Sequence, residues 1–131
     1  MLRFVKFLFT ITHSWIPNRT VCTEKKAGQT YIILNTKLLS DPTLHLCTLA
    51  EEIGHHITRA RSNLLECSAG DIEQIAEDEY KAKKWAVNFL VPKKEFQYLT
   101  ESKRLTDEDL AKHFNVTLEF IKLRRMARWV N

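Results

Sequence analysis

The chain has 131 residues, of which 44% are hydrophobic and 27% are charged. This length suits one compact domain with its own hydrophobic core, and the composition excludes a disordered or fibrous protein. The formal net charge of +4 is too small to indicate nucleic-acid binding by itself.

The first 16 residues are apolar but do not read as a targeting segment. Arg3 and Lys6 interrupt them, no run approaches about 18 apolar residues, and no clear cleavage site follows. The chain has three cysteines, an odd number without C-x-x-C spacing, which favours a reducing compartment. We therefore expect a cytoplasmic protein without a membrane partner.

Three short segments rich in β-branched and aromatic residues predict strands, at residues 3–12, 19–23 and 30–35. A turn at Pro17 and Asn18 separates the first two, and a polar loop with Gly28 near its tip separates the last two. Together they predict a small antiparallel sheet that covers one side of the helix that follows.

A helix is predicted over residues 42–58. Asp41 can cap it, and Pro42 suits its first position because the missing N–H has no partner there. Helical spacing places apolar residues on one stripe and polar residues on the opposite side. The stripe contains Leu46, Leu49, Ala50, Ile53 and Ile57, and the polar side contains Thr48, Glu51, Glu52 and His55.

The polar side of this helix carries the candidate chemistry. Glu51 and His55 are four residues apart, so both can reach one ion, and Glu52 lies beside it. This is the geometry of the H-E-x-x-H zinc helix, with glutamate in place of the first histidine. A second register stays open, because Glu52 and His56 are also four apart and could be the ligands, with Glu51 free.

Residues 59–70 predict a polar surface loop that could act as a flap. A second long helix then runs from a capping box, Asp71 with Gln74, to the stop before Pro92. Glu79 lies on its inward stripe of small and apolar residues, where a buried carboxylate needs a cation or a hydrogen-bonding partner. A metal would satisfy Glu79. The stripe contains Ile75, Ala82, Ala86 and Leu90.

The C-terminal part predicts a short helix at residues 92–99 and then a helix pair. Thr106 caps the first helix of the pair, which ends near Asn115, and Thr117 caps the second, which is predicted to reach residue 129. The second helix carries basic residues that could contact phosphates. Packing against the rest of the protein is the favoured alternative. These residues are Lys122, Arg124, Arg125 and Arg128.

Three strings of the sequence resemble the ImmA/IrrE metallopeptidases of bacteria, phages and integrative elements. The resemblance covers about residues 30–128 and is most specific in the two long helices. It implies an α+β fold in which a small sheet packs on a zincin-like helix pair. The strings are Leu-Ala-Glu-Glu-Ile-Gly-His-His at residues 49–56, Glu79-x-x-Ala82-x-x-Trp85-Ala86-x-x-Phe89-Leu90-Val91-Pro92, and Leu110-Ala111-x-x-Phe114-x-Val116-Thr117.

The resemblance also implies roles for single residues. In this family two histidines of H-E-x-x-H and a downstream acid bind zinc, and the motif glutamate activates water. Carried over, His55 and Glu79 are metal ligands, Glu52 is the general base, and Glu51 takes the place of the first histidine. The Glu-Glu-x-Gly-His motif is similar to the motif of phage-type members of this family. Zinc is the expected metal, with manganese or iron as alternatives because carboxylates are harder ligands.

The expected protein is a single metallopeptidase-like domain over residues 1–131. Residues 1–100 would form the zincin-like core, and residues 101–131 the helix pair that resembles a helix-turn-helix. The resemblance implies cleavage of a protein partner, a helix-turn-helix repressor of a phage or mobile element. The alternative is a scaffold that has lost its metal and regulates by binding protein or DNA, and Glu51 makes this alternative credible.

Overall fold

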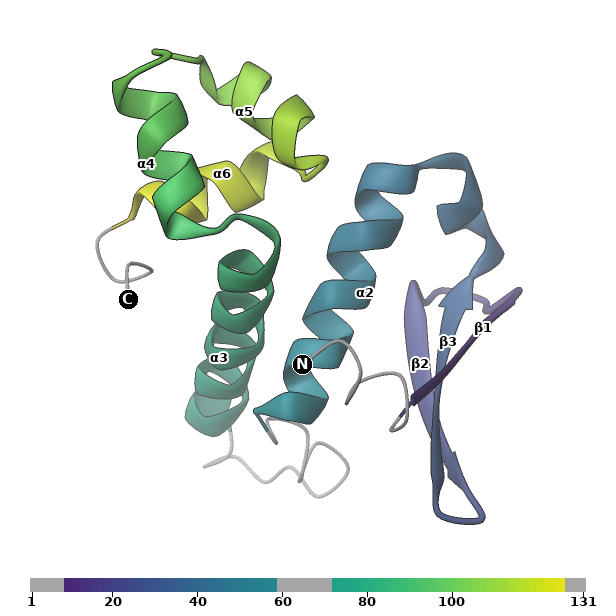
Figure 1. Cartoon of the computed structure of the whole chain (residues 1–131). Coiled ribbons are helices and arrows are strands. Elements are labelled where there is room, and N and C mark those ends of the chain that lie inside the picture. The colour runs from purple at the N-terminus through teal and green to yellow at the C-terminus, as the bar shows by residue number, and fades with distance from the viewer. Residues whose placement is uncertain (1–8, 59–71, 127–131) are drawn as a thin grey trace.

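The computed structural model describes residues 9–58 and 72–126. Within these residues a small sheet, one 3-10 helix and a set of α-helices follow one another, so the predicted α+β class is confirmed. Helix α2 lies between the sheet and α3, and the C-terminal helices gather at one end of α3 (Figure 1). The elements are β1 (Phe9–Ser14), β2 (Val21–Lys26), β3 (Gln29–Asn35), η1 (Thr36–Ser40), α2 (Pro42–Ile57), α3 (Ile72–Leu90), α4 (Lys93–Glu101), α5 (Asp107–Phe114) and α6 (Leu118–Arg125).

The sheet is mixed, with strand order β1-β3-β2. Strands β2 and β3 form the predicted antiparallel hairpin. Its two-residue turn consists of Ala27 and Gly28, whose φ values of 51° and 78° are the positive values that a type I′ turn requires. The predicted antiparallel pairing of β1 is wrong, because β1 runs parallel to β3.

Asn35, the last residue of β3, explains the position of β1. Its side-chain amide donates to the carbonyls of Ile16 and Arg19, each at 2.7 Å, and its backbone N–H donates to the carbonyl of Thr20 at 2.8 Å. The link between β1 and β2 is therefore held across the end of β3. This crossing leaves β3 in the centre, with β1 and β2 on its two edges.

The described parts of the predicted elements agree with the structure to within a few residues. Helix α2 begins at Pro42 as predicted, and Thr58 is its C-cap. The side chain of Asp41 caps its start by accepting from the N–H of Leu44 at 3.1 Å. The 3-10 helix η1 was not predicted. Residues 3–8, the loop at 59–70 and the capping box at Asp71 lie outside the described residues.

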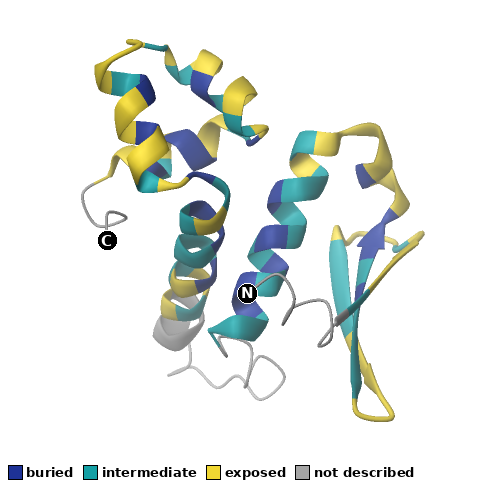
Figure 2. Cartoon of the chain, viewed as in Figure 1, coloured by how far each residue is buried: buried dark blue, intermediate teal, exposed yellow. Residues whose placement is uncertain are grey.

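Helix α2 is buried on two sides. Leu49 and Ile53 of the predicted apolar stripe pack on the sheet cluster of Ile32, Leu34 and Leu38, but Ala50 of that stripe does not. Cys47 and Ala50 belong to a second cluster on the side of α3. Figure 2 shows dark blue segments along α2 and on the part of α3 nearest the C-terminal helices. The second cluster also contains Ala86, Val87, Val91, Phe96, Leu99, Leu110, Val116, Phe120 and Ile121.

Helices α2 and α3 approach each other closely at Gly54. A Cβ atom added at this residue would collide with the backbone carbonyl oxygen of Ala82 and would lie 3.3 Å from its Cα. Only glycine therefore fits at this point of α2. The close approach brings the sequence neighbours of Gly54, including His55, to the face of α3.

The C-terminal helices are fixed by caps and by one buried arginine. Thr106 and Asp109 form a reciprocal capping box at the start of α5, and Asn115 ends α5 in the left-handed conformation, with φ 56°. Arg124 is 2% exposed and donates to the carbonyl of Val87 and to Asn88 Oδ1, at 3.2 and 2.6 Å. No helix among the described residues is long and apolar enough to cross a membrane.

Candidate metal centre on helices α2 and α3

His55 of α2 meets Glu79 of α3. The Nε2 atom of His55 lies 3.2 Å from Glu79 Oε1. The imidazole is buried, whereas the Glu79 side chain is 53% exposed. The expectation of a buried Glu79 is therefore wrong, because this part of the stripe lies at the rim of the helix interface. The expected neighbourhood of His55 and Glu79 is present.

The separation of these two atoms suits two ligands of one metal ion. Two donors that each lie about 2.0–2.1 Å from a tetrahedral zinc ion are about 3.3 Å from each other. The Nε2 to Oε1 distance of 3.2 Å agrees with that value. The same distance also suits a direct contact between an imidazole and a carboxylate.

The other ring nitrogen of His55 is an orphaned polar atom. Nδ1 is buried and has no hydrogen-bond partner among the described residues. A metal-ligating histidine usually donates its second N–H to a carboxylate, a carbonyl or water. Within the described part of the chain, Nε2 of His55 is therefore placed as a metal ligand would be. Its Nδ1 lacks the hydrogen-bond acceptor that usually orients a metal-ligating histidine.

Glu51 faces a lysine. Its Oε1 atom lies 3.9 Å from Nζ of Lys83, and that nitrogen lies 2.9 Å from Oε1 of Glu119 on α6. Burial raises the pKa of Glu51 to about 7, and the nearby Lys83 opposes this rise. As the side chains stand, no three histidine, cysteine or acidic residues of the described segments converge on one point. Two of the three expected ligands, His55 and Glu79, thus lie at the spacing of metal ligands, and Glu51 is the position where the arrangement departs from a three-ligand site.

The prediction that Glu52 shares one polar side with Glu51 and His55 is wrong, because Glu52 points to the sheet side of α2. It is 6% exposed, and its Oε1 accepts a hydrogen bond from Thr23 Oγ1 of β2 at 2.6 Å. His56 Nε2 lies 3.7 Å from the same oxygen. The alternative register of Glu52 and His56 therefore corresponds to a second acid–histidine pair, on the sheet side of the helix.

Three residues of this region were missed in the sequence. Thr23 could have been found from strand alternation, since Val21, Thr23 and Lys25 share the face that β2 turns toward α2. Lys83 follows Glu79 by four residues and so lies one turn along the same face of α3. Glu119 gave no signal, because its contact depends on how α6 packs.

The basic residues of the last helix have different surroundings. Lys122 is exposed, whereas Arg124 is buried against α3. Arg125 Nη2 lies 2.7 Å from Asp107 Oδ1, and its guanidinium stands 5.3 Å from the Phe96 ring centre. Arg128 lies outside the described residues. These contacts agree with the packing alternative for Arg124 and Arg125.

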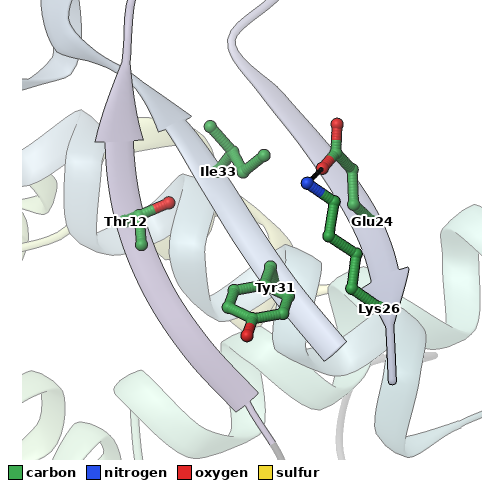
Figure 3. Close-up of a pocket in the computed structure, with 5 residues that line it drawn as sticks. All are labelled: Thr12, Glu24, Lys26, Tyr31 and Ile33. Atoms are coloured by element: carbon green, nitrogen blue, oxygen red, sulfur yellow. Dashed lines mark ion pairs between the residues drawn. The ribbon is translucent and has the colours of Figure 1, made fainter. Parts of the chain in front are cut away.

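A shallow hollow of about 330 Å³ lies on the sheet, away from these residues (Figure 3). Strand alternation places Tyr31 and Ile33 on the opposite face from Ile32 and Leu34, which pack on α2. The hollow is therefore separate from the candidate metal centre. Its lining residues are Thr12, Glu24, Lys26, Tyr31 and Ile33.

Comparisons with known proteins gave one match. The model of a peptidase family, described as the IrrE N-terminal-like domain, matches residues 14–126. These residues include α2 and α3 and the C-terminal helices. No curated protein and no solved structure matches the chain.

Proposed function

The chain belongs to the IrrE N-terminal-like peptidase family, and on this premise we propose that it is a metal-dependent endopeptidase. In this proposal His55, Glu79 and Glu51 hold the metal and Glu52 is the general base. The metal is zinc, with manganese or iron as alternatives.

The observation that carries this proposal is the contact between His55 and Glu79. The two residues are 24 positions apart and come from different helices, yet their side-chain atoms lie 3.2 Å apart. If Glu79 were only a surface charge that keeps α3 soluble, a contact with the buried His55 imidazole would not be expected. The resemblance carries the family's ligand roles over to these same two residues, which supports the proposal.

Glu51 would be the third ligand if its carboxylate left Lys83 and bound the metal instead. It lies one turn before His55 on α2, so a rotation about its side-chain bonds would move its carboxylate away from Lys83 and toward His55. With two carboxylates and one neutral imidazole, the ligands would cancel the charge of a divalent ion. The site would then be a weaker Lewis acid than one with two histidines.

Glu52 would act as the general base that accepts a proton from the attacking water. A bound metal supplies a Lewis acid that polarises the scissile carbonyl and acidifies water. The Glu52 carboxylate takes a proton from the attacking water and delivers it to the leaving amine. The hydrogen bond from Thr23 Oγ1 holds this carboxylate on the sheet side of α2, so Glu52 would have to exchange that bond for one to the attacking water before it acts as the base.

The proposed substrate is a protein, specifically a helix-turn-helix repressor of a phage or mobile element. The family resemblance supports this part of the proposal. The half-exposed side chain of Glu79 supports access of a large substrate, because the candidate centre is open to solvent on that side.

Metal analysis of purified variants tests the proposal. We expect about one divalent ion per chain, with loss of binding in His55→Ala and in Glu79→Ala. Glu52→Gln should keep the metal but lower cleavage of a repressor substrate by roughly 10²-fold or more. Glu95→Ala is the matched control, since Glu95 forms an exposed acid–histidine pair with His113 at 2.7 Å, away from the centre. Unchanged metal binding in Glu79→Ala would show that Glu79 is not a metal ligand.

A second candidate is a metal-free regulatory module on the peptidase scaffold. The specific observation in its favour is Lys83, which supplies a positive charge beside Glu51. This candidate predicts a metal content near zero in protein purified without chelators. It also predicts that Glu52→Gln leaves regulation by the protein intact.

A further inference from the structure

We propose that Lys83 is a positioning residue that sets the metal affinity of the centre, and that Glu119 holds Lys83 back from Glu51. This inference rests on the proposed function, because it concerns the same ligands. It also links the C-terminal helix pair to the centre.

The geometry places Lys83 between three elements. It projects from α3 one turn after Glu79, and its Nζ lies 3.9 Å from Glu51 of α2 and 2.9 Å from Glu119 of α6. Only the contact with Glu119 is short enough for a hydrogen bond. Lys83 is therefore bonded to α6 and close to, but not bonded to, the proposed ligand.

The charge of Lys83 opposes a metal ion in two ways. An ammonium group near Glu51 attracts the carboxylate that the metal needs as its ligand. It also repels a divalent cation through a partly screened Coulomb interaction, which extends over several ångströms at a half-buried site. The Lys83 side chain is 28% exposed, as is that of Glu51, so this interaction is only partly screened by water.

Glu119 reduces both effects. Its charge-assisted hydrogen bond fixes the ammonium group at the α6 side and neutralises part of its charge. If Glu119 loses its charge, Glu51 and Glu79 are the acidic residues that remain near Lys83, and Glu51 is the one within 4 Å of its Nζ. The lysine would then move closer to Glu51 and compete more strongly with the metal. Removal of Lys83 and removal of the Glu119 charge should thus change metal affinity in opposite directions.

Zinc titration of metal-stripped protein against a competing chelator tests the inference. We expect Lys83→Met to bind zinc roughly three- to tenfold more tightly than the unmodified chain, and Glu119→Gln to bind it several-fold more weakly. Lys81→Met and Glu77→Gln are the matched controls. They form an ion pair at 3.2 Å on the same helix α3, and we expect both controls to keep the unmodified affinity.

The two opposite shifts separate the proposal from a structural effect. A variant that merely disturbs folding would bind zinc more weakly in both cases, so unchanged or weaker binding in Lys83→Met overturns the inference. Unmodified or tighter binding in Glu119→Gln overturns the role of Glu119. If the unmodified chain binds no zinc but Lys83→Met binds one ion, the inference is supported and the peptidase proposal fails. If neither protein binds zinc, both fail.

Discussion

At the scale of single residues, Glu79 contacts the buried His55 ring although its own side chain is 53% exposed. The helical repeat placed Glu79 on a stripe with small residues, and the structure brings it to His55. The repeat gives only the direction of a side chain around the helix axis. It does not say where along the axis the neighbouring helix stops, and so the exposure of Glu79 could not be predicted. The contact of Lys83 with Glu119 depends on tertiary packing and was missed for the same reason.

Asp109 provides a test at this scale. Hydrogen bonds from the side chain and backbone of Thr106 lower the pKa of Asp109 below its ordinary value of 3.8. The ionised form therefore stabilises the fold at neutral pH, and this contribution is lost as the pH falls through the folded pKa. We expect Asp109→Asn to melt below the unmodified protein at pH 7, with a difference that shrinks below about pH 4. Thermal melts followed by circular dichroism at several pH values measure this.

Glu108→Gln is the control for this experiment. It removes a charge from the same helical turn but leaves the contact of Thr106 with Asp109 intact. A pH-independent difference for Asp109→Asn would mean that the capping box does not depend on the charge of Asp109.

At the scale of elements, local signals located α2, α5 and the β2–β3 hairpin correctly. Asp41 and Pro42 mark the start of α2, and Thr106 marks the start of α5. The parallel pairing of β1 could not be predicted in this way. It depends on the side chain of Asn35, which donates to the link between β1 and β2 across the end of β3. An asparagine at the end of a strand is equally compatible with an ordinary turn.

The contact of α2 with α3 is testable at Gly54. Alanine normally stabilises a helix by about 1 kcal/mol relative to glycine. At this position the added methyl group meets the Ala82 carbonyl, so we expect Gly54→Ala to lower the free energy of unfolding by roughly 1–3 kcal/mol. Zinc affinity should fall as well, because His55 moves away from Glu79. Urea denaturation of Gly54→Ala and of the control Thr48→Ala on the same helix measures the effect, and a stabilised Gly54→Ala would refute the close approach.

At the scale of the whole molecule, one hydrophobic cluster joins the proposed core and the C-terminal helices. Cys47 and Ala50 of α2 share it with Leu110, Phe120 and Ile121. Each of these larger side chains contributes about 1.5–3 kcal/mol when it is fully buried. Their sum is comparable to the total stability of about 5–15 kcal/mol that is usual for a small domain. This supports the proposal that the chain folds as one unit.

Removal of the C-terminal helices tests this proposal. We expect a chain ending at Glu101 to lose cooperative thermal unfolding, because apolar side chains of α2 and α3 would become exposed to water. Circular dichroism melts of the shortened and full-length chains make the comparison. A cooperative transition within a few degrees of the full-length chain would show that the helix pair is an independent domain.

The position of α2 between two layers has a consequence for any motion of the protein. Glu52 is bonded to Thr23 of the sheet, whereas His55 contacts Glu79 on the opposite layer. The two side chains are three positions apart in sequence, but Glu52 is positioned by the sheet and His55 contacts α3. A sliding of the sheet relative to α3 would therefore alter the spacing of the proposed base and the proposed ligand while α2 itself stays unchanged. The proposed catalytic geometry would therefore depend on how the layers are aligned, and a partner that binds only the β2–β3 hairpin would change it.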